Sequence, residues 1–252
     1  MKRAHLLAGL LMCVTAALHG QSPEQMFQQG NQLYQQGRVA EALETYESIL
    51  RNGYAGGELY YNLGNAYYKT GNIAKAILNY ERALKIMPED DDLRHNLQLA
   101  NLMITDKIEP APRLFVWDYW EGVKNAFSLQ GITWITYLVF VMTIGSFAVV
   151  ILARSYAVRK AGILSGVGTA LLFAVLLVIF IVKVSDYRRS DEAVVTAGIT
   201  TIKNSPDTKS SDAFVLHSGV KVQITDRVSE WIKIRLADGK VGWLESTAAE
   251  NI

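Results

Sequence analysis

The sequence has almost no cysteine, few histidines and no overall charge bias. Its 252 residues include one cysteine, Cys13, and four histidines, and the formal net charge is +1. Because Cys13 lies in an N-terminal apolar segment, the rest of the chain can form neither disulfides nor cysteine-bound metal sites. The balanced charge predicts no nucleic-acid partner. No nucleophile–base pair, phosphate-binding loop or metal-ligating spacing is found, which predicts a non-enzymatic protein without a cofactor or a metal.

The first residues have the pattern of a secretory signal. Two basic residues precede an apolar run over positions 6–18, and Gly20 precedes a polar sequence. At about 1.5 Å per residue, this run is too short to cross a hydrocarbon core of about 30 Å. We therefore predict a signal peptide over residues 1–20, cleaved after Gly20. An uncleaved anchor and a lipid on Cys13 remain the alternatives.

An internal repeat follows the apolar segment. The matched pairs, all at one spacing, are Gly30 and Gly64, Asn31 and Asn65, Tyr34 and Tyr68, Gly37 and Gly71, Ala40 and Ala74, Ala42 and Ala76, Tyr46 and Tyr80, Glu47 and Glu81, and Leu50 and Leu84. Each unit has two helix-length segments separated by a glycine, which can adopt the left-handed conformation that ends a helix. We expect Gly30 and Gly64 to lie against Ala42 and Ala76, so that the paired helices approach closely.

The repeat resembles the tetratricopeptide repeat, which has the same period as these pairs. The second unit, residues 57–90, matches that pattern at Leu63, Gly64, Tyr67, Gly71, Ala76, Tyr80, Ala83 and Pro88. The first unit, residues 23–56, departs from it at two positions. The resemblance implies an all-α repeat domain over residues 21–106, in which residues 91–106 form a capping helix.

The resemblance also implies a partner-binding groove lined by the first helix of each unit. Carried onto this sequence, the lining residues are Phe27, Asn31, Tyr34, Tyr61, Asn62, Asn65, Tyr68, His95 and Asn96. Tyrosine rings offer rigid contact area, and asparagine amides can pair with a peptide backbone. The basic residues of the family's carboxylate clamp have no counterpart, so a clamp is not predicted. Packing between helices remains the alternative for Tyr34, Tyr61 and Tyr68, and it is our prediction for Tyr67 and Tyr80.

Two further expectations concern this groove. The amide of Asn65 is expected to have no structural partner, so that its removal would weaken partner capture without affecting the fold. Residues 22–106 contain seven basic and eleven acidic residues, a net charge of −4. This charge predicts a partner segment that carries some positive charge.

Two uncharged apolar segments come next, at positions 132–153 and 161–182. At about 1.5 Å per residue each reaches about 33 Å, enough to span a bilayer. The connection, residues 154–160, carries three basic residues and no acidic one, which places it in the cytoplasm by the positive-inside rule. We therefore predict a transmembrane hairpin in a bacterial inner membrane, with both flanking regions in the periplasm.

Two features surround this hairpin. Residues 107–131 are rich in aromatic side chains and are predicted to form an interfacial linker that leads into the bilayer. Gly162, Gly166 and Ala170 form a stripe of small residues on the second segment. Packing within the hairpin and formation of a homodimer both remain open as roles for this stripe.

From residue 190 onward, short β-type runs alternate with turn signals such as Asp238-Gly239. The order of turns and tryptophans resembles that of a bacterial SH3-like domain, which implies a small all-β barrel over residues 190–252. It also implies a peptide- or wall-binding surface at Trp231 and Trp243, with burial in the core as the alternative. His217 is predicted to be a turn residue.

The order of signal, repeats, paired membrane segments and SH3-like tail resembles the BatE-type proteins of the Bacteroides aerotolerance group. Local matches at Asn96-Leu97 and at residues 107–110 support the resemblance. It implies a membrane complex with von Willebrand A-type partners, linked to oxidative or envelope stress. The sequence thus predicts a multi-domain, non-enzymatic adaptor that binds other proteins. An envelope sensor whose SH3-like domain binds peptidoglycan is the alternative.

Overall fold

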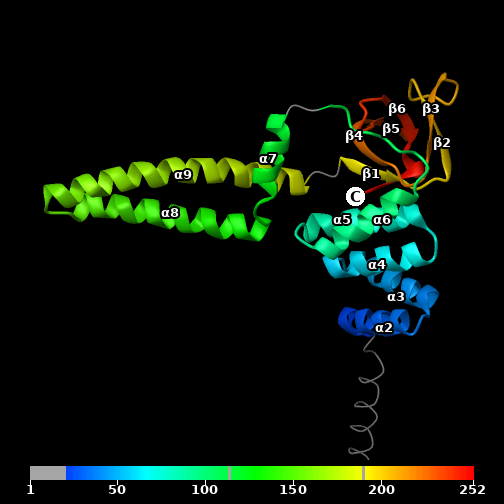
Figure 1. Cartoon of the computed structure of the whole chain (residues 1–252), viewed down its shortest axis with the longest axis horizontal. Coiled ribbons are helices and arrows are strands. Elements are labelled where there is room, and N and C mark those ends of the chain that lie inside the picture. The colour runs from blue at the N-terminus through cyan, green and yellow to red at the C-terminus, as the bar shows by residue number, and fades with distance from the viewer. Residues whose placement is uncertain (1–20, 113–114, 189–190) are drawn as a thin grey trace, which may run out of the picture.

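The computed structural model describes residues 21–112, 115–188 and 191–252, so the predicted signal peptide lies outside the described residues. Figure 1 shows a stack of short helices, a β domain beside it and a long helical hairpin. The predicted combination of helical repeat, paired apolar helices and small all-β domain is confirmed.

The helical stack consists of α2 (Pro23–Gln35), α3 (Val39–Arg51), α4 (Gly57–Lys69), α5 (Ile73–Ile86) and α6 (Asp91–Met103). Ser22 begins the array with a capping box. Its hydroxyl oxygen accepts from the backbone N–H of Gln25, and the side-chain oxygen of Gln25 accepts from the backbone N–H of Ser22. Gly37 and Gly71, with φ of 78° and 82°, provide the left-handed turns that end α2 and α4.

The helices α2, α4 and α6 have equal lengths, and they begin one repeat period apart, at Pro23, Gly57 and Asp91. By this spacing α6 is the first helix of a third unit, and residues 104–112 continue from it as a non-helical segment. Residues 104–112 therefore do not form the second helix that would complete this unit.

The two repeated glycines make room for tyrosine rings, a contact that the sequence did not predict. A Cβ atom on Gly30 would overlap the ring of Tyr46, and a Cβ atom on Gly64 would overlap the ring of Tyr80. Both rings are buried, each with 1% of its residue surface exposed. The close approach of the helices therefore serves to enclose a large ring, which buries more apolar surface than an alanine contact would. The predicted burial of Tyr80 is confirmed, as is that of Tyr67.

The β domain is one antiparallel sheet of seven strands in the order β3-β2-β6-β5-β4-β1-β7. The strands are β1 (Glu192–Val195), β2 (Ile199–Lys203), β3 (Asp212–His217), β4 (Lys221–Val228), β5 (Trp231–Arg235), β6 (Val241–Glu245) and β7 (Ala249–Asn251). Alternate residues of β5 and β6 are buried, as a half-buried strand requires. The Asp238-Gly239 turn joins these strands, with Gly239 at φ 92°.

The β domain packs directly on the end of the helical stack. Val194 of β1 belongs to the same buried cluster as Ile77 of α5. The turn at Gly219, with φ 97°, presses against Ile104, the residue that follows α6. The second helix of a third unit would pack on α5 and α6, and the β domain covers the array at this place. The array thereby gains the cover that two and a half repeats lack.

Polar contacts reinforce this junction. Lys221 of β4 lies 2.9 Å from Glu81 of α5 and 3.1 Å from Glu192 of β1. Burial disfavours its ammonium group, but the two carboxylates outweigh burial and raise the pKa of Lys221. His217 is the last residue of β3 and not, as expected, a turn residue, and its Nδ1 lies 3.0 Å from Asp106 Oδ1. The contacts fix the β domain against the repeats.

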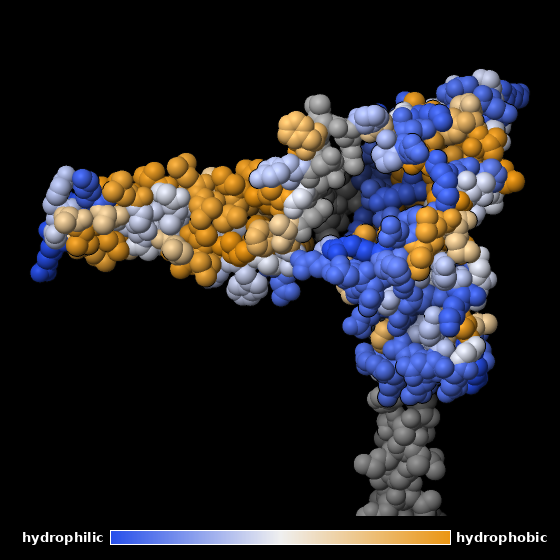
Figure 2. Space-filling view, in the orientation of Figure 1, coloured by the Kyte–Doolittle hydropathy of each residue, from blue (hydrophilic) through white to orange (hydrophobic). Residues whose placement is uncertain are grey.

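The remaining helices are α7 (Phe115–Asn125), α8 (Leu129–Leu152) and α9 (Tyr156–Arg188). By length and composition, α8 and α9 could each cross a membrane. Figure 2 shows apolar side chains along this hairpin, between a hydrophilic tip and the hydrophilic soluble domains. A Cβ atom on Gly162 would lie 3.0 Å from Val150, and one on Gly166 would lie 3.5 Å from Ser146. Both glycines thus pack within the hairpin, whereas Ala170 is exposed.

Candidate functional site

The first helices of the units share one face, which carries a repeated network of asparagines. The Tyr46 hydroxyl and the Asn62 Nδ2 both donate to Asn31 Oδ1, at 2.7 Å and 2.9 Å. The same arrangement recurs one repeat later. There Asn65 Oδ1 accepts from the Tyr80 hydroxyl at 2.8 Å and from the Asn96 Nδ2 at 3.1 Å. We call Asn31, Asn62, Asn65 and Asn96 the asparagine ladder.

The ladder corrects one expectation about Asn65. Its amide oxygen has two structural partners, so Asn65 supports the fold as well as lining the face. What remains for a partner is the other end of the amide. Among the described residues, the Nδ2 groups of Asn31 and Asn65 donate to no protein group, and neither is a buried unsatisfied atom. These two amides can donate to the carbonyl groups of a bound peptide.

Tyrosines surround the ladder. Asn96 Nδ2 also donates to the Tyr61 hydroxyl at 3.0 Å, and the Tyr61 ring packs at a tilt on Tyr80, with centroids 6.2 Å apart. The ammonium group of Lys69 lies 5.1 Å from the centre of the Tyr34 ring. Burial and the neighbouring Tyr61 raise the pKa of Tyr34. Burial is the main cause that raises the pKa of Tyr80, and the neighbouring Tyr61, Tyr34 and Tyr68 raise it further. The three groove tyrosines therefore gather around one buried phenol.

The outer predicted groove residues differ in their surroundings. Phe27 packs on Tyr46, with ring centroids 6.0 Å apart, and is half-buried at the α2 end of the face. His95 is exposed on α6. The structure thus joins Asn31 and Asn62 in one hydrogen-bonded group and Tyr61, Asn65 and Asn96 in a second, and it leaves His95 exposed beside them.

The two predicted tryptophans lie on the outer face of the β domain. Trp231 pairs with Glu245 across β5 and β6, and Trp243 pairs with Lys233. The ammonium group of Lys233 lies 5.8 Å from the centre of the Trp243 ring. Both tryptophans are partly exposed and lie outside the buried core. They therefore form a surface on which a ligand could stack.

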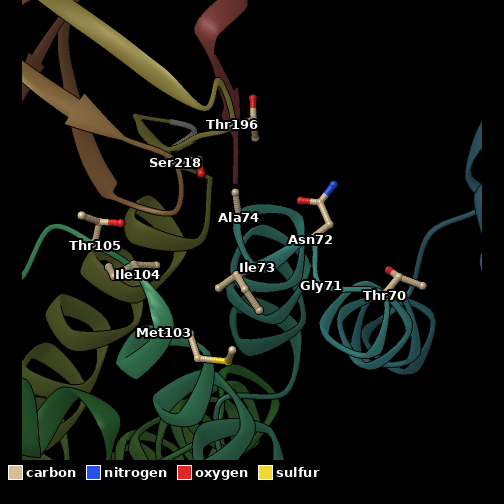
Figure 3. Close-up of a pocket in the computed structure, with 10 residues that line it drawn as sticks. All are labelled: Thr70, Gly71, Asn72, Ile73, Ala74, Met103, Ile104, Thr105, Thr196 and Ser218. Atoms are coloured by element: carbon tan, nitrogen blue, oxygen red, sulfur yellow. The ribbon is translucent and has the colours of Figure 1, made fainter.

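Two cavities at the junction of repeats and β domain were not found from the sequence. The first, of about 460 Å³, lies between the α4–α5 turn, the end of α6 and the β domain. Figure 3 shows its hydroxyl and amide groups, which come from Thr70, Asn72, Thr105, Thr196 and Ser218. No charged side chain of the described residues lines it. The second, of about 270 Å³, lies between α3, α4, α5 and β7 and is lined by charged residues. No sequence motif marks either cavity, because each is lined by residues that lie far apart in the chain.

Replacement of Asn65 by alanine is expected to lower the free energy of unfolding by about 1–3 kcal/mol, because the buried hydroxyl of Tyr80 loses its acceptor. A double variant, Asn65→Ala with Tyr80→Phe, removes the donor as well and should recover most of this loss. Urea unfolding of the detergent-solubilised chain, followed by hydrogen exchange of α4 and α5, measures both. Equal stability of Asn65→Ala and the parent would contradict the ladder.

Comparison with known families agrees with this geometry. Residues 27–91 match the model of the tetratricopeptide repeat, and residues 200–248 match that of the bacterial SH3 domain. No curated protein matches the chain. The repeat domain and the SH3 domain expected from the sequence are thus confirmed, and both are of kinds that bind proteins or peptidoglycan.

Proposed function

We propose that this chain is a non-enzymatic adaptor, anchored in the inner membrane, that binds partner proteins on the periplasmic side. The observation that carries the proposal is the shared face of α2, α4 and α6. It combines partly buried tyrosines with the two unused amide donors of Asn31 and Asn65. An extended peptide segment supplies what this face lacks, which is carbonyl acceptors at a regular spacing and flat apolar contact.

The chemistry of the partner follows from the charge of the repeats. Seven basic and eleven acidic residues between positions 22 and 106 give a net charge of −4. A segment with positive charge would therefore associate faster, with an effect on rate greater than on affinity. The setting we propose is a complex of the Bat aerotolerance type with von Willebrand A-type partners. Support for this setting is the order of signal, repeats, membrane hairpin and SH3 domain along the chain.

The test is partner recovery by a groove variant. The tagged full chain is crosslinked in native membranes, and the captured proteins are identified by mass spectrometry. Truncating an aromatic anchor typically costs about 2 kcal/mol or more. Tyr61→Ala combined with Tyr68→Ala should therefore reduce partner recovery by at least about tenfold.

Two controls accompany this variant. Tyr54→Ala removes an exposed tyrosine outside the groove, with 54% of its residue surface accessible, and should leave recovery unchanged. Tyr61→Phe with Tyr68→Phe retains the rings and shows how much the hydroxyls contribute. Limited proteolysis confirms that each variant is folded. Full recovery of the same partners by a folded double alanine variant would contradict the proposal.

An envelope sensor that binds peptidoglycan is the second candidate, favoured by the exposed face of Trp231 and Trp243. Sugar rings stack on such aromatic surfaces, and Lys233 beside Trp243 could meet wall carboxylates. In the same experiment the variants are sedimented with purified peptidoglycan. If the sensor proposal holds, the parent and the groove variant sediment alike and Trp243→Ala does not. If the adaptor proposal holds alone, none of them sediments.

A further inference from the structure

Three exposed apolar side chains lie on α6. Leu99, Leu102 and Met103 expose 38%, 69% and 58% of their residue surface. The repeat shift relates Leu99 to Asn65 of the asparagine ladder and Leu102 to a groove tyrosine of α4. Asn96, Leu99 and Met103 are spaced at i, i+3 and i+7, so they lie on one side of the helix. The three apolar residues, which we call the α6 patch, therefore extend the groove face along α6 from the ladder.

The α6 patch is not the side of the helix on which the second helix of a third unit would pack. In α4 the side that meets α5 includes Gly64 and Tyr67. The repeat shift places Gln98 and Asn101 at these positions of α6, and both are exposed. A polar side at this place is typical of a helix that ends a repeat array. The exposed apolar surface of α6 therefore belongs to the groove, where a bound apolar group would remove it from water.

The first junction cavity adjoins the α6 patch. Met103 belongs to the patch and also lines this cavity, together with Ile73 and Ile104 (Figure 3). The volume of about 460 Å³ leaves room for a large side chain. None of the described residues that line the cavity is charged, so a charged group would enter it without a partner. The patch and the cavity beside it therefore favour an uncharged, apolar side chain.

The charges beside the groove define a second feature of the occupant. The second residue of each first helix is acidic, at Glu24, Glu58 and Asp92, and all three are exposed. Along α6, Asp92 lies about 10 Å from Leu99 and about 16 Å from Met103, at about 1.5 Å per residue. An extended chain covers about 3.3 Å per residue, so these distances correspond to about three to five residues. A segment with a basic and an apolar side chain at this spacing can meet both Asp92 and the patch.

We propose that the groove holds an extended segment of a partner protein in which a large apolar residue lies about three to five residues from a lysine or arginine. The apolar side chain lies on the α6 patch, and the basic side chain meets Asp92. A backbone carbonyl of the segment accepts from the unused Nδ2 of Asn65. This inference rests on the proposed adaptor function and specifies its ligand. The apolar residue selects the partner, while the acidic residues mainly raise the rate of association.

The probe is a library of short random peptides, selected on the tagged full chain in nanodiscs, where no detergent competes for the patch. Selected peptides should combine a large apolar residue with a basic residue at the spacing given above. Replacing this apolar residue by serine should weaken binding to the parent at least about tenfold. On the double variant Leu99→Gln, Leu102→Gln, which lacks the patch, the same replacement should have less than about a twofold effect. Ile199→Gln, at an exposed apolar residue of β2, should bind like the parent.

The outcomes separate this inference from the proposed function. If Tyr61→Ala with Tyr68→Ala loses the peptides, but the folded Leu99→Gln, Leu102→Gln variant binds them like the parent, the groove binds peptides and the α6 patch takes no part. Selected peptides without an apolar residue would also overturn the inference, and a parent that selects no peptide would overturn both proposals. Hydrogen exchange of α6 shows that the patch variant is folded. Light scattering tests for a second copy: a parent dimer that becomes a monomer in the patch variant would assign the patch to self-association and contradict the inference.

Discussion

Leucine in place of Gly64 is expected to lower the free energy of unfolding of the repeat domain by about 2–3 kcal/mol. Even a Cβ atom at this position overlaps the ring of Tyr80, which is buried with 1% of its surface exposed. The ring cannot move outward, because its hydroxyl is held by Asn65 Oδ1 at 2.8 Å and Tyr61 packs against it. Helices α4 and α5 must therefore separate, and the groove network separates with them.

The measurement is hydrogen exchange of the amides of α4 and α5 in the full chain. The full chain is needed because the β domain covers the core of the repeats through Val194. Gly56→Ser is the matched control. A Cβ atom at Gly56 would meet no atom within 4 Å, its φ of −174° suits any residue, and serine is a good helix N-cap. If Gly64→Leu exchanges as slowly as this control, the pairing of α4 with α5 is wrong.

The repeat was predictable because its signal is local and repeated. One constant shift placed both complete units, and it also relates Leu59, Leu63 and Ala66 of α4 to Leu93, Leu97 and Ala100 of α6. These pairs identify α6 as the first helix of a third unit, whereas the prediction for it was a capping helix. The hydrogen-bond partners of the ladder were harder to foresee. Only the recurring spacing from Asn31 to Tyr46 and from Asn65 to Tyr80 indicated them.

The packing of the β domain on the repeats could not be predicted from the sequence. The residues that make this contact are an ordinary strand valine, Val194, a turn glycine, Gly219, and surface charges such as Lys221. Each would look the same in an isolated domain, since no periodicity distinguishes a strand that meets a helix from one that meets its own sheet. Both junction cavities depend on this contact and were therefore equally hidden. The apolar hairpin, in contrast, could be predicted, because the length and the lack of charge of its two segments are sufficient to recognise it.

The orientation of the hairpin leads to a prediction with an all-or-none result. Three basic residues in the connection, positions 154–160, and the absence of acidic ones there favour a cytoplasmic position for this loop. Cysteines are introduced singly at Gln36, Ser155 and Lys209 in a Cys13→Ser background. All three positions are exposed in the structure, so accessibility to solvent does not limit the reaction. In intact spheroplasts an impermeant maleimide should label the first and third and leave the second unlabelled.

Permeabilised spheroplasts provide the control, and there all three cysteines should label equally. The result matters for the adaptor proposal, because groove and β domain can serve one periplasmic partner only if α8 and α9 both cross the membrane. Gln36 lies before the hairpin and Lys209 after it, so an even number of crossings places them on the same side. Labelling of Ser155 in intact spheroplasts would reverse the orientation and move the repeats to the cytoplasm. Labelling of only one of Gln36 and Lys209 would mean that α8 or α9 does not span, because a single crossing separates the two domains.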